Sequence, residues 1–284
     1  MMKTICFSML MMAGLALTAC SSDDGNTEPQ IRKTYIMTVD ATKGMNEAAS
    51  RVSNRALSLT GSTLNASWAT SEQVYVQGTY ASDGKTKFWC DGFIQPQSAG
   101  ETVRLNGTIA LPDGSPYASI EAATGQVHPT LTLQFPRSGN LDYTGQIGTL
   151  SDIAANYDYA TATISVDVIN DRIVPYTETP AVFVNKQAIV QFTLKADTDG
   201  TPLLSPSALT VQYGEESLSL TIPSSTYTTN GAGVLFVAIP GFSDKKVILI
   251  ATVGDNTYTF TKSGVTFENR KYYEISMKMK KKTA

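Results

Sequence analysis

The sequence predicts an all-β protein built from two β-sandwiches in series, and three observations lead to this fold class. The chain of 284 residues is long enough for one large β domain or two of ordinary size. Charged residues make up only 17% of it, whereas tyrosine occurs 13 times and threonine is abundant, a composition typical of strand-rich exported proteins. Short apolar runs recur between glycine, proline, asparagine and aspartate residues, which is the spacing of strands and hairpins.

The N-terminus has the pattern of an export signal. Lys3 precedes a mostly apolar run over residues 5–17, which is shorter than the roughly 20 residues needed to cross a bilayer. Residues 17–20, Leu-Thr-Ala-Cys, resemble the lipobox of bacterial lipoproteins. We therefore expect residues 1–19 to be a lipoprotein signal peptide, and Cys20 to carry acyl chains such as palmitate that hold the protein at the cell outer membrane. The alternative is an ordinary signal peptide followed by an unrelated cysteine.

The first half of the mature chain reads as a series of strands. Tyr35, Met37 and Val39 alternate with polar neighbours and predict a first strand, and the polar residues 42–55 predict an exposed loop. A helical turn is expected at residues 151–156, capped by Ser151 or Asp152. Further strands are expected at residues 56–59, 72–77, 86–89, 102–109, 130–135 and 157–169.

The second half begins at a polar stretch that contains Pro175 and Pro180, where a domain junction is expected. The predicted division is a tether and N-terminal strand at residues 20–55, an N-terminal sandwich at 56–172 and a C-terminal sandwich at 173–284. Strands are expected at residues 181–184, 188–194, 209–213, 217–222, 233–239, 246–253 and 256–262. The last run alternates most strictly and places four apolar side chains on one face: Tyr273, Ile275, Met277 and Met279.

Composition excludes several classes of chemistry. A net charge of −3 and a pI near 5.3 give no basic footprint for nucleic acid. The single histidine, His128, is not accompanied by a G-x-S-x-G nucleophile motif. Cys6 leaves with the signal peptide and Cys20 is acylated, so Cys90 is expected to be a buried, inert thiol. We expect no metal, no cofactor and no enzymatic activity.

Two tryptophans and two acidic stretches have simple structural interpretations. Trp68 and Trp89 lie in strand-like contexts, where a tryptophan is usually buried and not available to stack on sugar rings. Residues 197–200 begin like a calcium loop but lack its later oxygen ligands, so a turn is favoured. Glu215 and Glu216 are interpreted as a hairpin tip, since one sequence cannot place a second acid at the distance a glycosidase needs.

Several strings, taken in order, resemble fimbrillin-family lipoproteins, the type V pilins. The likeness extends from the lipobox to the last strand. The strings occupy residues 55–68, 72–76, 133–137, 142–146, 157–162, 187–194 and 271–275.

The resemblance implies two transthyretin-like (Ig-like) sandwiches and a precursor that is cut at the cell surface by an Arg-specific protease. Arg55 and Ala56 match the family's cleavage position, with Arg51 as a second candidate. Cutting would remove the strand of Tyr35, Met37 and Val39. A strand of a neighbouring pilin subunit would then fill the vacated groove by donor-strand exchange.

The resemblance implies a structural role in an extracellular pilus that supports cell adhesion, and alternatives remain open at this point. The last run, with Tyr273 at its start, is the candidate donor, but it is equally an ordinary closing strand of the second sandwich. The chain is alternatively the lipid-retaining anchor subunit of a pilus. A surface glycan-binding lipoprotein, which needs a platform of exposed aromatic residues, is the alternative from another class.

Overall fold

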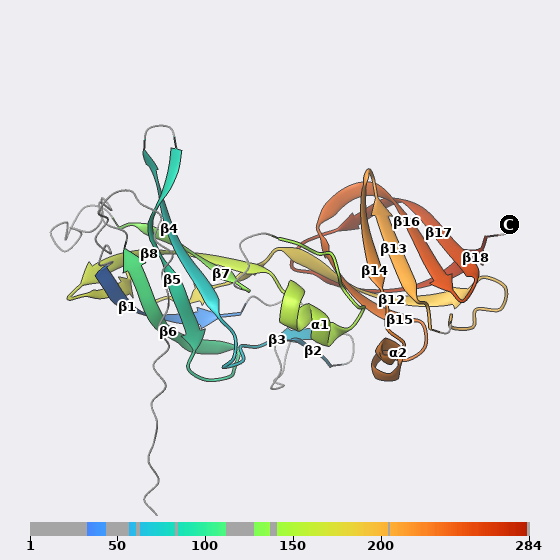
Figure 1. The fold of residues 1–284 in the computed structure, drawn as a ribbon, viewed down its shortest axis with the longest axis horizontal. Helices are drawn as coiled ribbons and strands as arrows, with labels where there is room; N and C mark the ends of the chain where they lie inside the picture. Colours follow the sequence, from blue (N-terminus) through green and yellow to red (C-terminus); the bar gives the residue numbers. More distant parts are fainter. Residues whose placement is uncertain are drawn as a thin grey trace, which may run out of the picture. The chain divides into compact units, whose positions relative to one another are not determined.

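The computed structural model describes residues 33–43, 57–60, 63–82, 85–111, 128–136, 141–203 and 205–282. These residues are mostly strand and turn, and their helices are short, so the predicted all-β class is confirmed. They form two principal sheets and a small two-stranded hairpin of β2 (Leu57–Thr60) and β3 (Thr63–Ala66) (Figure 1). No helix among the described residues is both long and apolar enough to cross a membrane.

The first sheet closes on itself like a barrel. Its strands run in the order β10-β1-β6-β5-β4-β7-β8-β11, and β9 pairs with both β1 and β8, which completes the ring. The alternating side chains of these strands fill one apolar core. The nine strands are β1 (Lys33–Thr42), β4 (Val74–Ser82), β5 (Lys85–Pro96), β6 (Thr102–Leu111), β7 (Thr130–Phe135), β8 (Ala160–Ile169), β9 (Arg172–Pro175), β10 (Ala181–Val182) and β11 (Val184–Asn185).

The change from the first sheet to the second lies between β11 and β12, C-terminal to the boundary expected at residues 172 and 173. The reason is a tight hairpin: Ile169 pairs with Arg172, and the two residues between them, Asn170 and Asp171, both have positive φ. Such two-residue turns return a strand directly to its neighbour. The segment expected to be a junction therefore continues the first sheet as β9, β10 and β11.

The second sheet is an open path with the order β14-β13-β16-β17-β18-β12-β15. β18 pairs with β12 in parallel at eight positions, from Ile189 opposite Tyr272 to Ala196 opposite Met279. On its other side it meets β17 at only two register pairs near its C-terminal end. The strands are β12 (Gln187–Ala196), β13 (Ala208–Tyr213), β14 (Glu216–Thr221), β15 (Val234–Pro240), β16 (Phe242–Val253), β17 (Asn256–Phe267) and β18 (Tyr272–Lys281).

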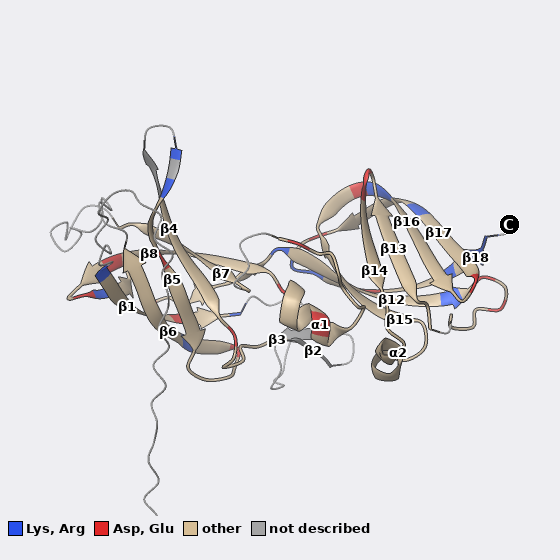
Figure 2. Ribbon diagram, viewed as in Figure 1, with Lys and Arg blue, Asp and Glu red and all other residues tan. Residues whose placement is uncertain are grey.

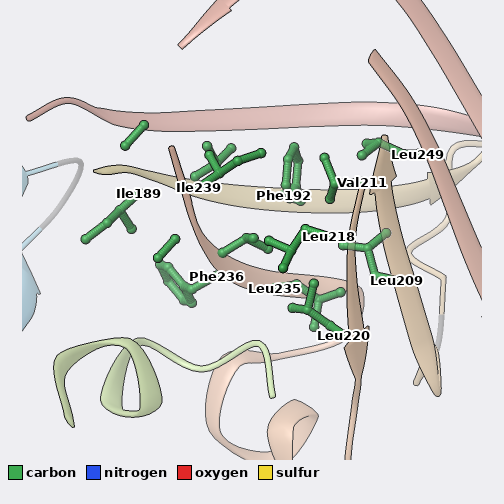
Figure 3. Close-up of a cluster of buried hydrophobic side chains, with 14 of the residues drawn as sticks. Ile189, Phe192, Leu209, Val211, Leu218, Leu220, Leu235, Phe236, Ile239 and Leu249 are labelled. Carbon is green, nitrogen blue, oxygen red and sulfur yellow. The ribbon is translucent and has the colours of Figure 1, made fainter. Parts of the chain in front are cut away.

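The core of the second sheet is aliphatic and aromatic (Figure 3). β12 and β15 contain continuous buried runs, because both of their faces are covered. Gln146 helps to cover β15, since its side chain donates to the carbonyl of Ala238 at 2.8 Å and accepts from the Ala238 N–H at 2.8 Å. The charged residues, coloured blue and red on the ribbon of Figure 2, occupy only small parts of the strands, in agreement with the low content of charged residues.

Within the described part of the chain, helical structure is limited to three short segments. The turn expected at residues 151–156 is present as α1 (Leu150–Asp152) followed by a single π turn (Ile153–Tyr157). The expected cap was wrong, because the side chain of Thr149 accepts the capping hydrogen bond from the N–H of Asp152. A second helix, α2 (Ser225–Asn230), was not predicted, since its Ser-Thr-Tyr-Thr-Thr-Asn sequence has no apolar period.

Candidate functional site

The N-terminal strand β1 is bonded to the first sheet along both of its edges. It pairs antiparallel with β6 over ten positions, from Lys33 opposite Leu111 to Thr42 opposite Thr102. Its other edge meets β9 and β10 in parallel. The strand therefore supplies a complete wall of the closed sheet, although it comes from the extreme N-terminal end of the described chain.

The inner face of β1 is buried. The exposed fractions of Tyr35, Met37, Val39 and Ala41 are 1%, 0%, 2% and 0%. Burying Met37 and Val39 alone contributes about 3–6 kcal/mol gross. The three residues that the sequence singled out in this strand thus share one face, and that face points into the core of the first sheet.

The outer face of β1 is polar except for Ile36, and side-chain hydrogen bonds join it to β6. Asp40 accepts a hydrogen bond from Arg104 Nε at 3.0 Å, and Asn106 donates to the hydroxyl of Thr38 at 3.1 Å. Ion pairs between exposed groups contribute little to stability. The attachment of β1 therefore depends on its inner face and its backbone bonds more than on its surface charges.

Lys43, one residue beyond β1, is buried with an exposed fraction of 1%. Its Nζ lies 2.7 Å from Oε1 of Glu72 and 3.6 Å from Oδ2 of Asp158. The ammonium group also lies 4.1 Å from the ring centre of Phe135 and 5.1 Å from that of Trp68. Two carboxylates and two aromatic rings thus surround one lysine, an arrangement that we call the Lys43 cage.

The two carboxyl groups of the cage depend on the lysine for their charge. Burial raises the pKa of Glu72, and Lys43 opposes that rise. Burial likewise raises the pKa of Asp158, against the effect of Lys43 and of a hydrogen bond from Gln187. Removing one partner of a buried ion pair leaves an uncompensated charge and costs about 3–5 kcal/mol. The cage therefore fastens the end of β1 to the sheet.

Sequence reasoning missed the cage because it assigned residues 42–55 to an exposed loop and interpreted lysine as a surface residue. A signal was nevertheless present. Lys43 continues the alternation of Tyr35, Met37, Val39 and Ala41, so it belongs to the same inner face. Nothing in the sequence marked Glu72 or Asp158 as its partners, which the fold brings together from distant positions.

The predicted cleavage and lipidation residues lie outside the described residues. These are Cys20, Arg51, Arg55 and Ala56. The end of β1 at Thr42 and the start of β2 at Leu57 flank the segment that contains the two arginines and Ala56. Cleavage anywhere in that segment would separate β1 from the rest of the chain.

The candidate donor residues all lie in β18, within the second sheet. Met277 and Met279 are buried, and Tyr273 and Ile275 are half-buried. A groove of about 400 Å³ opens beside β18, along the stretch where β18 is not paired with β17. Aromatic and aliphatic side chains of β17 and β18 line it, among them Phe260, Phe267, Tyr273, Ile275 and Met277.

The remaining sequence candidates have structural roles. Trp68 and Trp89 are buried, as expected, so they form no exposed platform for a glycan. Cys90 is buried, and burial raises the pKa of its thiol to about 12, which keeps it unreactive at neutral pH. Nδ1 of His128 lies 2.6 Å from Oδ1 of Asp167, and its ring stacks on Tyr176.

The acidic loop at residues 197–200 forms the expected turn, in which Asp199 accepts hydrogen bonds from the N–H and hydroxyl of Thr201. Glu216 lies at the start of β14, directly after the turn that follows β13. Among the residues that the structure describes, no group of three or more histidine, cysteine or acidic side chains is placed to hold a metal ion.

Comparisons with known proteins give only distant structural likeness. No family model matches the sequence, and no curated protein does. A solved structure of a proposed cell adhesion protein from Bacteroides ovatus covers 88% of this chain and 96% of its own, with 13% identity and a TM-score of 0.47. A fimbrial assembly protein from Parabacteroides distasonis covers 86% and 90%, with 12% identity and a TM-score of 0.42. A fimbrial protein from Bacteroides ovatus matches 87% of this chain and 49% of its own, with 11% identity and a TM-score of 0.37.

Proposed function

We propose that this chain is a structural subunit of a cell-surface pilus, activated by proteolysis and polymerised by donor-strand exchange in support of cell adhesion. The position of β1 carries the proposal. This strand forms a wall of the closed first sheet, yet its covalent connection to the other strands of that sheet runs through the segment that contains Arg55. One cut therefore makes a core strand removable.

Loss of β1 would turn the first sheet into an acceptor. The inner face of the strand would leave an apolar groove where Tyr35, Met37 and Val39 now lie. β6 would lose its partner along ten positions, which frees a row of backbone donors and acceptors. An apolar groove beside an unpaired edge is the requirement for strand addition.

The strand β18 is the proposed donor. Tyr273, Ile275, Met277 and Met279 alternate in it, as the buried residues of β1 alternate. Its two register pairs with β17 give little resistance to release, although its pairing with β12 must also be broken. The donor of one subunit would thus leave its own second sheet and enter the first sheet of the next.

The remaining steps of the proposal come from the N-terminal sequence. Residues 1–19 direct export, Cys20 holds the precursor at the outer membrane through its lipid, and an Arg-specific surface protease cuts between Arg55 and Ala56. The partners are then other pilin subunits, and the chain itself needs no cofactor and performs no catalysis.

The test is proteolysis of the purified precursor with an Arg-specific protease, followed by N-terminal sequencing and electron microscopy. We expect a product that starts at Ala56 and forms fibres, and we expect Arg55→Ala to abolish both. Arg51→Ala is the matched control and should assemble normally. Fibres formed by Arg55→Ala at the wild-type rate would contradict the proposal.

An anchor subunit is the second candidate, and the Lys43 cage is the observation that favours it. A segment fastened by a buried ion pair resists dissociation even after its chain has been cut. Mass spectrometry of surface preparations distinguishes the two roles. Recovery of lipidated residues 20–55 with the fibre supports the anchor, and their absence supports a shaft or tip subunit.

A further inference from the structure

The first and last strands of the described chain carry the same sequence of side-chain types. On each strand, a lysine, a tyrosine, three apolar residues and a second lysine follow one another at alternate positions. In β1 and its extension these are Lys33, Tyr35, Met37, Val39, Ala41 and Lys43. In β18 and the residue before it they are Lys271, Tyr273, Ile275, Met277, Met279 and Lys281. The alternation alone is common in strands, but a lysine at the end of the apolar row is not explained by it.

We propose that Lys281 of a neighbouring subunit replaces Lys43 between Glu72 and Asp158 when subunits assemble, and so fixes the register of the inserted strand. This inference rests on the proposed donor-strand exchange and adds a residue-level partner to it. The incoming strand would run in the same direction as β1, with Tyr273 at the position of Tyr35.

The charge of the vacated site supports this register. Removing β1 takes Lys43 from the cage, while Glu72 and Asp158 stay in strand-flanking positions of the remaining sheet. Among the described residues, no other lysine or arginine forms an ion pair with either carboxylate. Two buried carboxylates without a cation are costly. A strand that brings an ammonium group to the same point is favoured over one that brings an apolar or acidic side chain.

The aromatic walls of the cage make the site suited to lysine in particular. Phe135 and Trp68 present their rings to the Lys43 ammonium group. Neither ring belongs to β1, so both remain after the strand leaves. Rings of this kind attract a cation and also cover the aliphatic stem of its side chain.

Lys281 is available for this role. It is exposed in the second sheet, and within the described residues it makes no ion pair. Its backbone forms one of the two register pairs that join β18 to β17. Because the side chain of Lys281 is exposed, replacing it leaves the core of the second sheet unchanged. An effect of this mutation on assembly can therefore be assigned to the subunit junction.

A register set by charge is needed because the apolar residues alone specify it weakly. A strand with alternating apolar side chains fits a groove equally well after a shift by two residues. Met277 and Met279 are larger than Val39 and Ala41, and the flexible methionine side chain adapts to such differences. On the outer face Lys278 would meet Arg104, an exposed like-charge contact with a small cost.

The test compares two lysines of the same strand in the full-length precursor after Arg-specific cleavage. Lys281→Met removes the inward ammonium group, and Lys280→Met is the matched control on the opposite face. Fibre assembly is followed by light scattering and electron microscopy. We expect Lys281→Met to weaken the subunit junction by about thirtyfold or more, and Lys280→Met to leave it close to wild type.

A rescue variant separates the ion pair from a general effect of the mutation. In a chain that carries Glu72→Gln and Asp158→Asn, we expect Lys281→Met to have no further effect on assembly, because the cage no longer needs a cation. A disulfide between Asn106→Cys of one subunit and Ser276→Cys of the next would report the register directly, because Ser276 would take the position of Thr38, which lies opposite Asn106. We expect this cross-link in fibres grown from a mixture of the two single variants.

The outcomes distinguish this inference from the function on which it rests. If wild-type fibres form from Ala56 and Lys281→Met behaves like Lys280→Met, the register is wrong and donor-strand exchange stands. If the cleaved wild-type chain forms no fibres, the proposed function and this inference fall together.

Discussion

The two principal sheets hold their terminal strands in different ways. β1 is paired along both edges and is fastened at its end by the buried Lys43 cage. β18 is paired with β12 at eight positions but with β17 at only two, and the lysine at its end, Lys281, is exposed. Two strands with similar side-chain order are thus held by different contacts. Under the proposed function, the first sheet keeps its strand until the chain is cut, whereas the second releases its own.

The largest expected effect comes from fixing β18 in place. Thr193 of β12 lies opposite Ser276 of β18, so cysteines at both positions are placed to form a disulfide between the strands. If β18 is the donor, the oxidised Thr193→Cys/Ser276→Cys variant should be cleaved but form no fibres, and reduction should restore assembly. Electron microscopy with and without reductant checks this. The two single-cysteine variants are controls, and fibres from the oxidised double variant would place the donor elsewhere.

Removing the ammonium group from the cage is expected to cause the largest loss of stability from a single substitution. Lys43→Met leaves Glu72 and Asp158 buried without a cation, and should lower the free energy of unfolding of the precursor by about 3–5 kcal/mol. Urea denaturation measures this loss. Lys33→Met at the exposed start of the same strand is the control, for which about 0–1 kcal/mol is expected. Equal losses for the two variants would show that the cage does not fasten β1.

The stability lost in Lys43→Met should depend on pH. Burial raises the folded-state pKa of Glu72 and Asp158, and losing Lys43 raises it further. Groups with a raised folded pKa give their full stability below the unfolded carboxyl pKa of about 4. They lose it as pH rises through the folded value. The deficit of Lys43→Met should therefore be largest near neutrality and shrink on acidification. A deficit that stays constant with pH in urea titrations would contradict this.

The two faces of β1 should differ in their tolerance of substitution. Met37→Ala creates a cavity in the core and should cost about 2–5 kcal/mol. Its neighbour Ile36 is 50% exposed, so Ile36→Ala is the matched control and should cost far less. Denaturation curves of the two variants provide the comparison. Similar losses would mean that the inner face is not the attachment of the strand.

The smallest expected effect concerns the surface of the same strand. Arg104→Ala removes the exposed ion pair with Asp40 and should change the free energy of unfolding by less than about 1 kcal/mol. Thermal denaturation at low and high salt checks it. A loss comparable to that of Lys43→Met would show that the outer charges, and not the cage, hold β1.

The features that could be predicted from the sequence were the strands in which apolar and polar residues alternate. The alternation of Tyr35, Met37 and Val39 and that of Tyr273 to Met279 each identified a strand and its inward face. Ordinary turn residues marked most of the other strands. These local patterns were sufficient to predict the all-β class, because the alternation in each strand depends only on the residues of that strand.

The features that could not be predicted depend on contacts between distant residues. Lys43 was assigned to a loop because a lysine is rarely buried, and only the fold shows that Glu72 and Asp158 surround it. The continuation of the first sheet to Asn185 depends on the tight turn at Asn170 and Asp171. Neither residue is a glycine, so the positive φ values were not evident from the sequence.

The two register pairs between β17 and β18 also have a mechanical consequence. A force that peels β18 away from β17 meets those pairs one after the other, near the C-terminal end of the strand. A force that slides a strand along β6 loads ten positions at once, because the pairing of β1 with β6 covers the whole strand. Although β18 also pairs with β12 at eight positions, its pairing with β17 opens one pair after the other, whereas a strand paired along the whole of β6 resists tension by shear.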